Sequence, residues 1–251
     1  MARVGEQPGF GLVFLHYFGG SARAWDGVIA RLEGAFDCAP LDFRGFGAER
    51  NAAGPYSVDA YADDVASLIE RRDLERIVLI GHSMGGKVAL AVAARRLAAL
   101  GALVLIAPSP PTPEPMGEDV RVEMLAAHGD RDAMLGIARR ITASPLPPAL
   151  LDQVADDMIL TAPTAWSAWL REGSRETVAM GAGRLAVPAL VVTGTEDTTI
   201  PRGVLESDVM PVLSDGRLVA VAGAGHLLPL EAPERVAAVI EAAARNAKES
   251  S

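Results

Sequence analysis

A serine lies between two glycines in the segment Gly-His-Ser-Met-Gly at 81–85, and this segment limits the folds that the chain can adopt. The four residues before it, 77–80, are all apolar and predict a buried strand, and the alanine-rich residues after Gly86 predict a helix. A strand that turns into a helix within three residues forces the residue between them, Ser83, into a strained backbone conformation and requires glycine on both sides. A glycine-flanked serine also occurs in ordinary loops, so the rest of the chain must decide its role.

Composition limits the class of protein. The chain has 251 residues, 50% of them apolar and 22% charged, which suits one sizeable α/β domain. Its apolar runs have the length of strands and fall short of a membrane span, and residues 1–10 lack the apolar core of a secretory signal. The single cysteine, Cys38, excludes an internal disulfide framework and is compatible with a reducing compartment, so we expect a cytoplasmic protein.

Charge and histidine content limit which partners and metal ions the chain is expected to bind. A net charge of −9 argues against a nucleic acid or an anionic membrane surface as partner. Four histidines and one cysteine, none at ligand spacing, predict no metal site.

The first half of the chain alternates strands and helices. Apolar runs predict strands near 10–16, 35–42, 76–80 and 102–107, with helical periodicity between them. This alternation predicts right-handed βαβ units and a mainly parallel sheet flanked by helices.

The alternation stops after the fourth strand. Residues 108–115 contain five prolines, and the pattern from 118 to 180 is helical throughout. Strand signals return at 189–192 and 218–221, and a final helix is predicted at 233–246. We therefore expect one structural domain, with a core formed by 1–111 and 181–251 and a helical cap inserted at 112–180.

Serine needs a base to remove its proton, and the base needs a third group to orient it. Functional residues of parallel sheets gather at the carboxyl ends of strands, and Asp197 and His226 each follow a predicted strand. The order Ser83, Asp197, His226 is the order expected when the serine lies at a strand-to-helix nucleophile elbow. We interpret His82 and His16 as structural and expect the other histidine, His128, to be solvated on the cap.

Acyl transfer also requires two N–H donors aimed at the developing oxyanion. One is expected from Met84, the residue after the serine. The other is expected from the turn after the first strand, where Phe18 is the natural candidate.

The motifs together resemble the α/β-hydrolase superfamily over residues 12–244, in its capped, serine-nucleophile branch. They are Leu-His-Tyr-Phe-Gly-Gly-Ser (15–21), Asp-Phe-Arg-Gly-Phe-Gly (42–47), Gly-His-Ser-Met-Gly-Gly (81–86), Gly-Thr-Glu-Asp-Thr-Thr-Ile-Pro (194–201) and Gly-His-Leu-Leu-Pro-Leu-Glu-Ala-Pro-Glu (225–234). The resemblance implies an α/β-hydrolase fold with Ser83 as nucleophile, Asp197 as acid and His226 as base. Family members commonly have glycine where this chain has Tyr17. They also carry an antiparallel hairpin before the first parallel strand, so we expect a shortened N-terminal sheet edge here.

The nucleophile also narrows the reaction. Related epoxide hydrolases and haloalkane dehalogenases use aspartate at the elbow, whereas Ser83 favours an acyl-enzyme. We expect hydrolysis of a small or medium carboxylic ester, thioester or lactone, a small-molecule acyl substrate, without metal or organic cofactor. The predicted pocket residues are Phe18, Met84, Trp166, Trp169 and Leu227.

Other functions stay open. Within the same family, the alternatives are carbon–carbon bond hydrolysis and a cofactor-free haloperoxidase or perhydrolase. Two alternatives come from other functional classes. One is a ligand receptor without turnover on the hydrolase scaffold, and the other is a non-catalytic interaction protein. Steady-state turnover of simple esters separates the enzyme from both.

Overall fold

The computed structural model describes residues 9–181 and 183–249, and its centre is a parallel sheet. Within these residues the sheet has 6 strands in the order β2-β1-β3-β4-β5-β6, and every neighbouring pair is parallel. The strands are β1 Phe10–Leu15, β2 Asp37–Leu41, β3 Arg76–His82, β4 Leu100–Ile106, β5 Ala189–Gly194 and β6 Gly216–Val221. All six predicted strands are present, which confirms the parallel α/β architecture.

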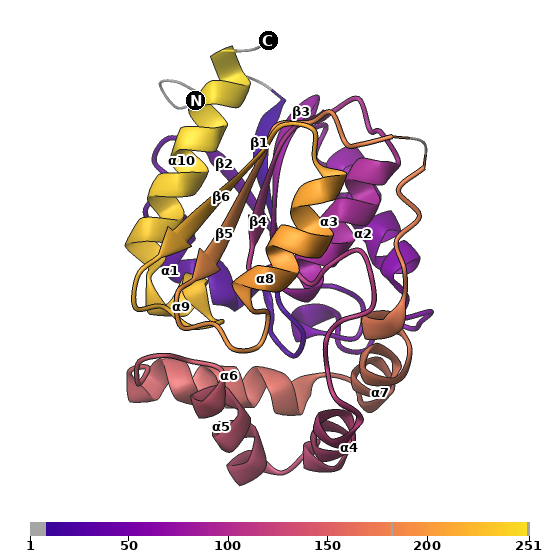
Figure 1. Cartoon of the computed structure of the whole chain (residues 1–251), viewed down its shortest axis with the longest axis vertical. Coiled ribbons are helices and arrows are strands. Elements are labelled where there is room, and N and C mark those ends of the chain that lie inside the picture. The colour runs from indigo at the N-terminus through magenta and orange to yellow at the C-terminus, as the bar shows by residue number, and fades with distance from the viewer. Residues whose placement is uncertain (1–8, 182, 250–251) are drawn as a thin grey trace.

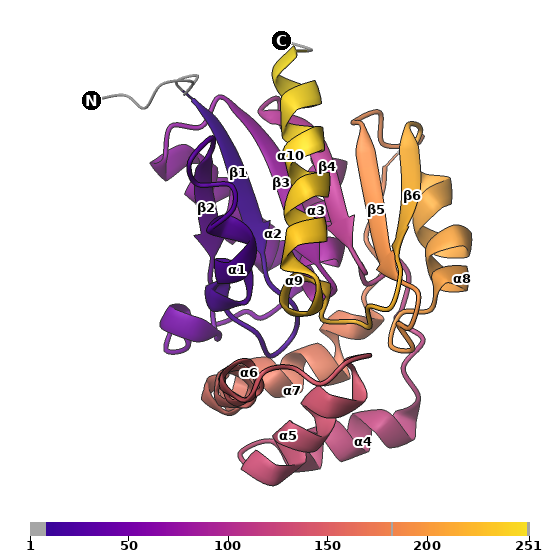
Figure 2. The same ribbon diagram turned by 90° about the vertical axis from the view of Figure 1, so that its left-hand side faces the viewer.

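Helices cover both faces of this sheet (Figures 1 and 2). On one face lie α1 (Asp26–Ile29) and α10 (Pro233–Glu249), and on the other lie α2 (Val58–Arg71), α3 (Met84–Ala94) and the short α8 (Arg202–Val204). The remaining short segments of the core are η1 Ala22–Trp25, η2 Gly47–Glu49, η4 Leu205–Val209, η5 Met210–Val212 and α9 Leu228–Glu231.

The central strand β3 shows why such strands are apolar throughout. Leu79 packs into the core beneath α2 and α3, whereas Val78 and Ile80 pack into the core beneath α1 and α10. A strand covered on both faces has no solvent side and needs no alternation of polar residues.

The helix predicted after the first strand is shorter than expected. Trp25, Val28 and Leu32 repeat at helical spacing and are all buried, but the α-helix ends at Ile29. The chain continues in tight turns, in which the N–H of Leu32 donates to the carbonyl of Ile29. The apolar period identified the buried face correctly, while three-residue turns replaced the longer helix.

Four helices form a separate layer across the carboxyl ends of the strands (Figure 1). They are α4 Glu118–Ala127, α5 Arg131–Arg140, α6 Pro148–Leu160 and α7 Pro163–Arg171, followed by η3 Gly173–Arg175. We call α4–α7 the cap helices. They lie inside the predicted insertion at 112–180, and no strand occurs between residues 112 and 180.

A buried carboxylate fastens the cap helices to the sheet domain. Asp157 of α6 is 4% exposed. It accepts a hydrogen bond from the hydroxyl of Ser21, over 2.8 Å, and forms an ion pair with Arg23. A second link runs from the N–H of Ala162 to the carbonyl of Gly45, over 2.8 Å. The cap is therefore held by polar contacts on the side of β1 and β2.

The N-terminal edge of the sheet is short in the part of the chain that the structure describes. There β2 is an edge strand that pairs with β1 alone, and no antiparallel strand extends it. The residues that precede this sheet, 1–8, lie outside the described ranges. None of the helices in those ranges combines the length and hydropathy that a membrane span requires.

Candidate active site

The turn between β3 and α3 has the strained geometry predicted for it. Ser83 lies there with φ 52° and ψ −115°, in the region of positive φ that residues other than glycine rarely adopt. A Cβ on Gly81 would lie 2.3 Å from the carbonyl oxygen of Gly85, and one on Gly85 would lie 2.5 Å from the carbonyl oxygen of Leu15. Both glycines are therefore required by close backbone contacts.

Two further strand ends bring a histidine and a carboxylate to this serine. His226, after β6, places Nε2 3.0 Å from Oγ of Ser83 and Nδ1 2.9 Å from Oδ2 of Asp197, which follows β5. With the proton on Nδ1, the imidazole donates to Asp197 and accepts the hydrogen bond of the serine hydroxyl. All three side chains are buried. Ser83 and His226 are 143 residues apart in the sequence.

The carboxylate of Asp197 is fixed on its other side by the backbone. Its Oδ1 accepts hydrogen bonds from the N–H groups of Thr199, over 2.8 Å, and Ile200, over 3.1 Å. Burial opposes ionisation, but the charge and hydrogen bond of His226 and these two N–H bonds together hold the pKa of Asp197 below its usual value. The carboxylate thus stays ionised and keeps the imidazole oriented.

The backbone of His226 is held from two directions. Its N–H donates to the carbonyl of Ile141, at the end of α5, over 2.9 Å. Its carbonyl lies 2.8 Å from Nε2 of His82, whose pKa burial lowers to about 3, so His82 is neutral and donates this bond. Glu231 accepts from the N–H groups of Gly225 (2.9 Å) and of the cap residue Ala143 (2.8 Å). The imidazole position therefore depends on the cap as well as on the sheet.

Two of the predicted non-catalytic histidines can be placed. His16 is buried between strand and loop, with Nδ1 2.8 Å from the carbonyl of Tyr17 and Nε2 accepting the N–H of Phe43, which is a structural role. The expectation that His128 is solvated is wrong, because its ring is partly buried. Its Nε2 lies 2.9 Å from the carbonyl of Thr161, and its ring packs against Trp166.

The predicted oxyanion donors lie on the two segments that approach Ser83. Met84 begins α3, where the first N–H groups have no partner within the helix, and Phe18 lies in the turn after β1. Within residues 9–181 and 183–249, neither of these N–H groups donates a hydrogen bond to the protein.

A cavity of about 280 Å³ opens beside Ser83 and His226, between the sheet domain and the cap. Of the predicted pocket residues, Phe18 and Trp169 line it. Its other lining residues are Tyr17, Glu114, Pro115, Met116, Gly117, Val120, Met124, Ile137, Arg140, Ile141, Met158, Thr198, Thr199 and Ile200.

Three predicted pocket side chains lie elsewhere, which corrects the sequence interpretation. Met84 is fully buried in the core beneath α2 and α3, because the residue that starts α3 faces inward. Trp166 donates from its indole N–H to the carbonyl of Met124 and packs its ring against Phe18, with 4.5 Å between the ring centres. Leu227 is fully buried between the cap and the sheet domain. Of these three side chains, Trp166 supports the cavity wall through its contacts with Phe18 and Met124.

Glu114 and the methionines of the cavity are not among the residues that the sequence predicted for the pocket. Glu114 is the acidic residue of the proline-rich stretch directly after β4, and its position at a strand's carboxyl end is the signal that could have identified it. Met116, Met124 and Met158 carry no local signal, because their access to the cavity depends on how the cap packs.

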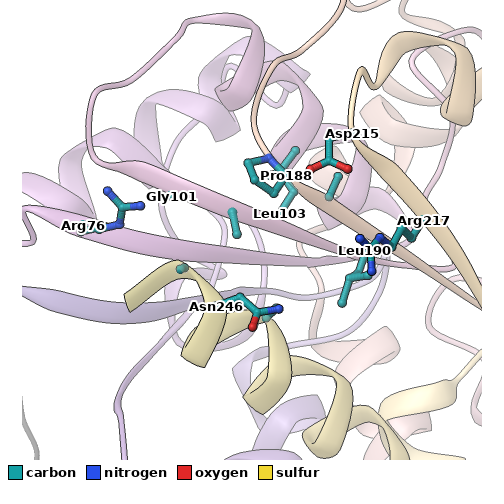
Figure 3. A pocket seen from close by; sticks show the side chains of 12 residues that line it. Arg76, Gly101, Leu103, Pro188, Leu190, Asp215, Arg217 and Asn246 are labelled. Atoms are coloured by element: carbon teal, nitrogen blue, oxygen red, sulfur yellow. The ribbon is translucent and has the colours of Figure 1, made fainter. Parts of the chain in front are cut away.

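A second, open hollow of about 400 Å³ lies far from this site, at the amino ends of β4, β5 and β6 beside α10 (Figure 3). Arg76, Asp215, Arg217 and Asn246 are among its lining residues. It contains none of the side chains that surround Ser83.

Comparison with known proteins identifies relatives of this chain. Lipase LipV of Mycobacterium tuberculosis is 28% identical over 214 residues, which cover 75% of this chain and 76% of the lipase. An uncharacterized protein of the same organism is 35% identical over 79 residues, but the match spans only 23% of that protein's length.

Solved structures share the fold. An esterase from Exiguobacterium antarcticum has a TM-score of 0.87 at 20% identity and covers 96% of this chain and 93% of its own. A thermophilic esterase from Thermogutta terrifontis has a TM-score of 0.78 at 26% identity and covers 95% and 90%. The sequence model of the alpha/beta hydrolase family matches residues 12–239, nearly the whole chain. The chain therefore belongs to the alpha/beta hydrolase family.

Proposed function

We propose that this hydrolase cleaves a small or medium carboxylic ester, thioester or lactone through an acyl-enzyme on Ser83. The observation that carries the proposal is the hydrogen-bond chain from Ser83 through His226 to Asp197, with distances of 3.0 and 2.9 Å. A serine hydroxyl held against a neutral imidazole, itself oriented by an ionised carboxylate, is equipped to attack an acyl carbon.

In the first half of the reaction, Oγ of Ser83 bonds to the acyl carbon while its proton passes to Nε2 of His226. The carbonyl oxygen becomes an oxyanion, which the N–H groups of Phe18 and Met84 stabilise, and Asp197 stabilises the imidazolium. The carbon–oxygen or carbon–sulfur bond then breaks, and the leaving group takes the proton from His226. In a lactone the leaving alcohol stays attached to the acyl group.

In the second half, His226 removes a proton from water as the water oxygen attacks the acyl carbon. The new tetrahedral species collapses, the ester bond to Ser83 breaks, and Oγ recovers its proton from His226. The products are a carboxylic acid and free enzyme.

The cavity supports a modest substrate. Its volume of about 280 Å³ suits a compact acyl group, and apolar side chains such as Phe18, Ile137 and Trp169 form much of its wall. The names of the relatives, lipase and esterase, agree with an ester as substrate.

Turnover of a panel of p-nitrophenyl acetate, butyrate and longer esters tests the proposal. The wild-type protein should turn over at least one of them many times. Ser83→Ala should lower kcat on the order of 10⁶-fold while the circular dichroism spectrum stays unchanged. A single burst without further turnover would favour a ligand receptor, and full activity in the alanine variant would refute the mechanism.

A further inference from the structure

One cavity residue has no part in the mechanism above. Glu114 lies in the loop between β4 and α4 and lines the same cavity as Ser83 and His226. Its backbone is fixed, because its N–H donates to the carbonyl of Ser174 over 2.8 Å and its carbonyl accepts from Met116 over 2.8 Å. A carboxyl group on a fixed stretch of backbone thus lies in the same cavity as Ser83 and His226.

Only one of its two oxygens is engaged by the protein. The buried hydroxyl of Ser109 donates to Oε1 of Glu114. Throughout the described ranges, no protein group donates to Oε2, and Glu114 is a partly exposed residue that lines the cavity. Oε2 is therefore available to a ligand.

Within residues 9–181 and 183–249, the carboxyl group of Glu114 forms no direct ion pair. The two nearby cations are committed to other groups: Lys87 donates to the carbonyls of Thr112 (3.0 Å) and Ser174 (3.4 Å), and Arg121 donates to the carbonyl of Leu170 (2.7 Å). Arg140, at the cavity rim, pairs with Glu123 over 2.9 Å. Among the described residues none of these cations forms an ion pair with Glu114.

Burial makes the ionised form of Glu114 unfavourable. Burial raises the pKa of Glu114, although the Ser109 hydrogen bond and the charges of Lys87, His226 and Arg121 oppose the rise. A carboxylate without an ion-pair partner in a largely apolar cavity is stabilised when a bound cation provides the opposite charge. The net charge of −9 on the whole chain also favours the approach of a cation.

We propose that Glu114 is a specificity-determining residue that selects substrates carrying an ammonium group, with its free oxygen Oε2 pairing with that cation while Ser83 attacks the acyl carbon. The proposal rests on the hydrolase function proposed above. It deepens that function by naming the substrate class, a cationic ester or thioester.

Two pairs of isosteric substrates test this selection. Acetylthiocholine and its analogue with tert-butyl in place of trimethylammonium vary the leaving-group side. The p-nitrophenyl ester of trimethylammoniobutanoate and its tert-butyl analogue vary the acyl side. In at least one pair, the wild-type kcat/KM should be about tenfold or more higher for the cationic member. Equal or higher values for the neutral member in both pairs would overturn the proposal.

Glu114→Gln separates charge recognition from a structural role. The glutamine amide oxygen can still accept the Ser109 hydroxyl, so the variant removes the charge with little change in shape. The ratio of kcat/KM for the cationic member to kcat/KM for the neutral member should fall about tenfold. An equal loss for both members would show that Glu114 is only structural and would overturn the proposal.

Asp119→Asn is the matched control, because Asp119 is an exposed carboxylate on α4 that does not line the cavity. It should leave the preference unchanged, and an equal effect in this variant would refute a specific role for Glu114. The wild-type comparison decides the question even where Glu114→Gln does not fold. Absence of Ser83-dependent turnover on every ester would instead refute the hydrolase function itself, so the two failures are distinguishable.

Discussion

Lys87 allows a quantitative test of how the cap is joined to the sheet domain. Its side chain is fully buried on α3, and its ammonium group donates to Thr112, where the chain leaves for the cap, and to Ser174, where it returns. Both bonds end on neutral carbonyls, and burial lowers the pKa of Lys87 to about 8. The native state therefore releases this proton well before an unfolded lysine does.

The sign of the stability effect follows from proton binding. Between about pH 8 and the unfolded pKa of about 10.5, the unfolded chain binds more protons at this site than the native chain, so the free energy of unfolding rises with pH. Over the whole window, deprotonation of Lys87 raises the free energy of unfolding by about 3 kcal/mol. About 2 kcal/mol of this rise falls between pH 7 and pH 9.5.

Urea unfolding of the wild type and of Lys87→Met at these two pH values measures the effect. The wild type should gain about 2 kcal/mol relative to the variant on going from pH 7 to pH 9.5. Groups such as the Cys38 thiol, whose pKa burial raises to about 12, titrate in both proteins and cancel in the comparison. A difference between the two proteins that does not change with pH would refute the burial argument for Lys87.

Two substitutions test the site and its cap. Asp197→Asn should lower kcat on the order of 10⁴-fold, because an amide cannot hold the imidazole of His226 in the proton-accepting tautomer. Rates of ester hydrolysis measure this loss, and a loss of less than tenfold would contradict the assignment of Asp197 as the residue that orients His226. Asp157→Asn should lower the free energy of unfolding by about 1–3 kcal/mol, because it weakens the buried contacts to Ser21 and Arg23; urea unfolding measures it, and unchanged stability would show that these contacts do not fasten the cap.

The sheet and the arrangement at its carboxyl edge could be predicted because their signals are local. Strands such as β3 are short apolar runs, and parallel strands bring their carboxyl ends to one edge. The positions of Asp197 and His226, each directly after such a strand, were therefore enough to predict that they meet Ser83.

The cavity wall could not be predicted because it depends on packing between distant segments. The aromatic residues Trp166 and Trp169 are three positions apart on α7, yet only Trp169 reaches the cavity. Which of them does so depends on how α7 rotates against Phe18 and α4, and neither contact has a signature in the sequence. The same holds for Glu114, whose neighbour Ser174 comes from the far end of the cap.

Acylation of Ser83 is required by the proposed mechanism, and intact-protein mass spectrometry after treatment with a fluorophosphonate tests this claim. One adduct per chain is expected, located on Ser83 by peptide mapping and prevented by prior incubation with an excess of a slowly hydrolysed ester. Ser83→Ala should remain unlabelled. No adduct on the folded wild-type protein, or an adduct of equal yield in the alanine variant, would contradict the claim.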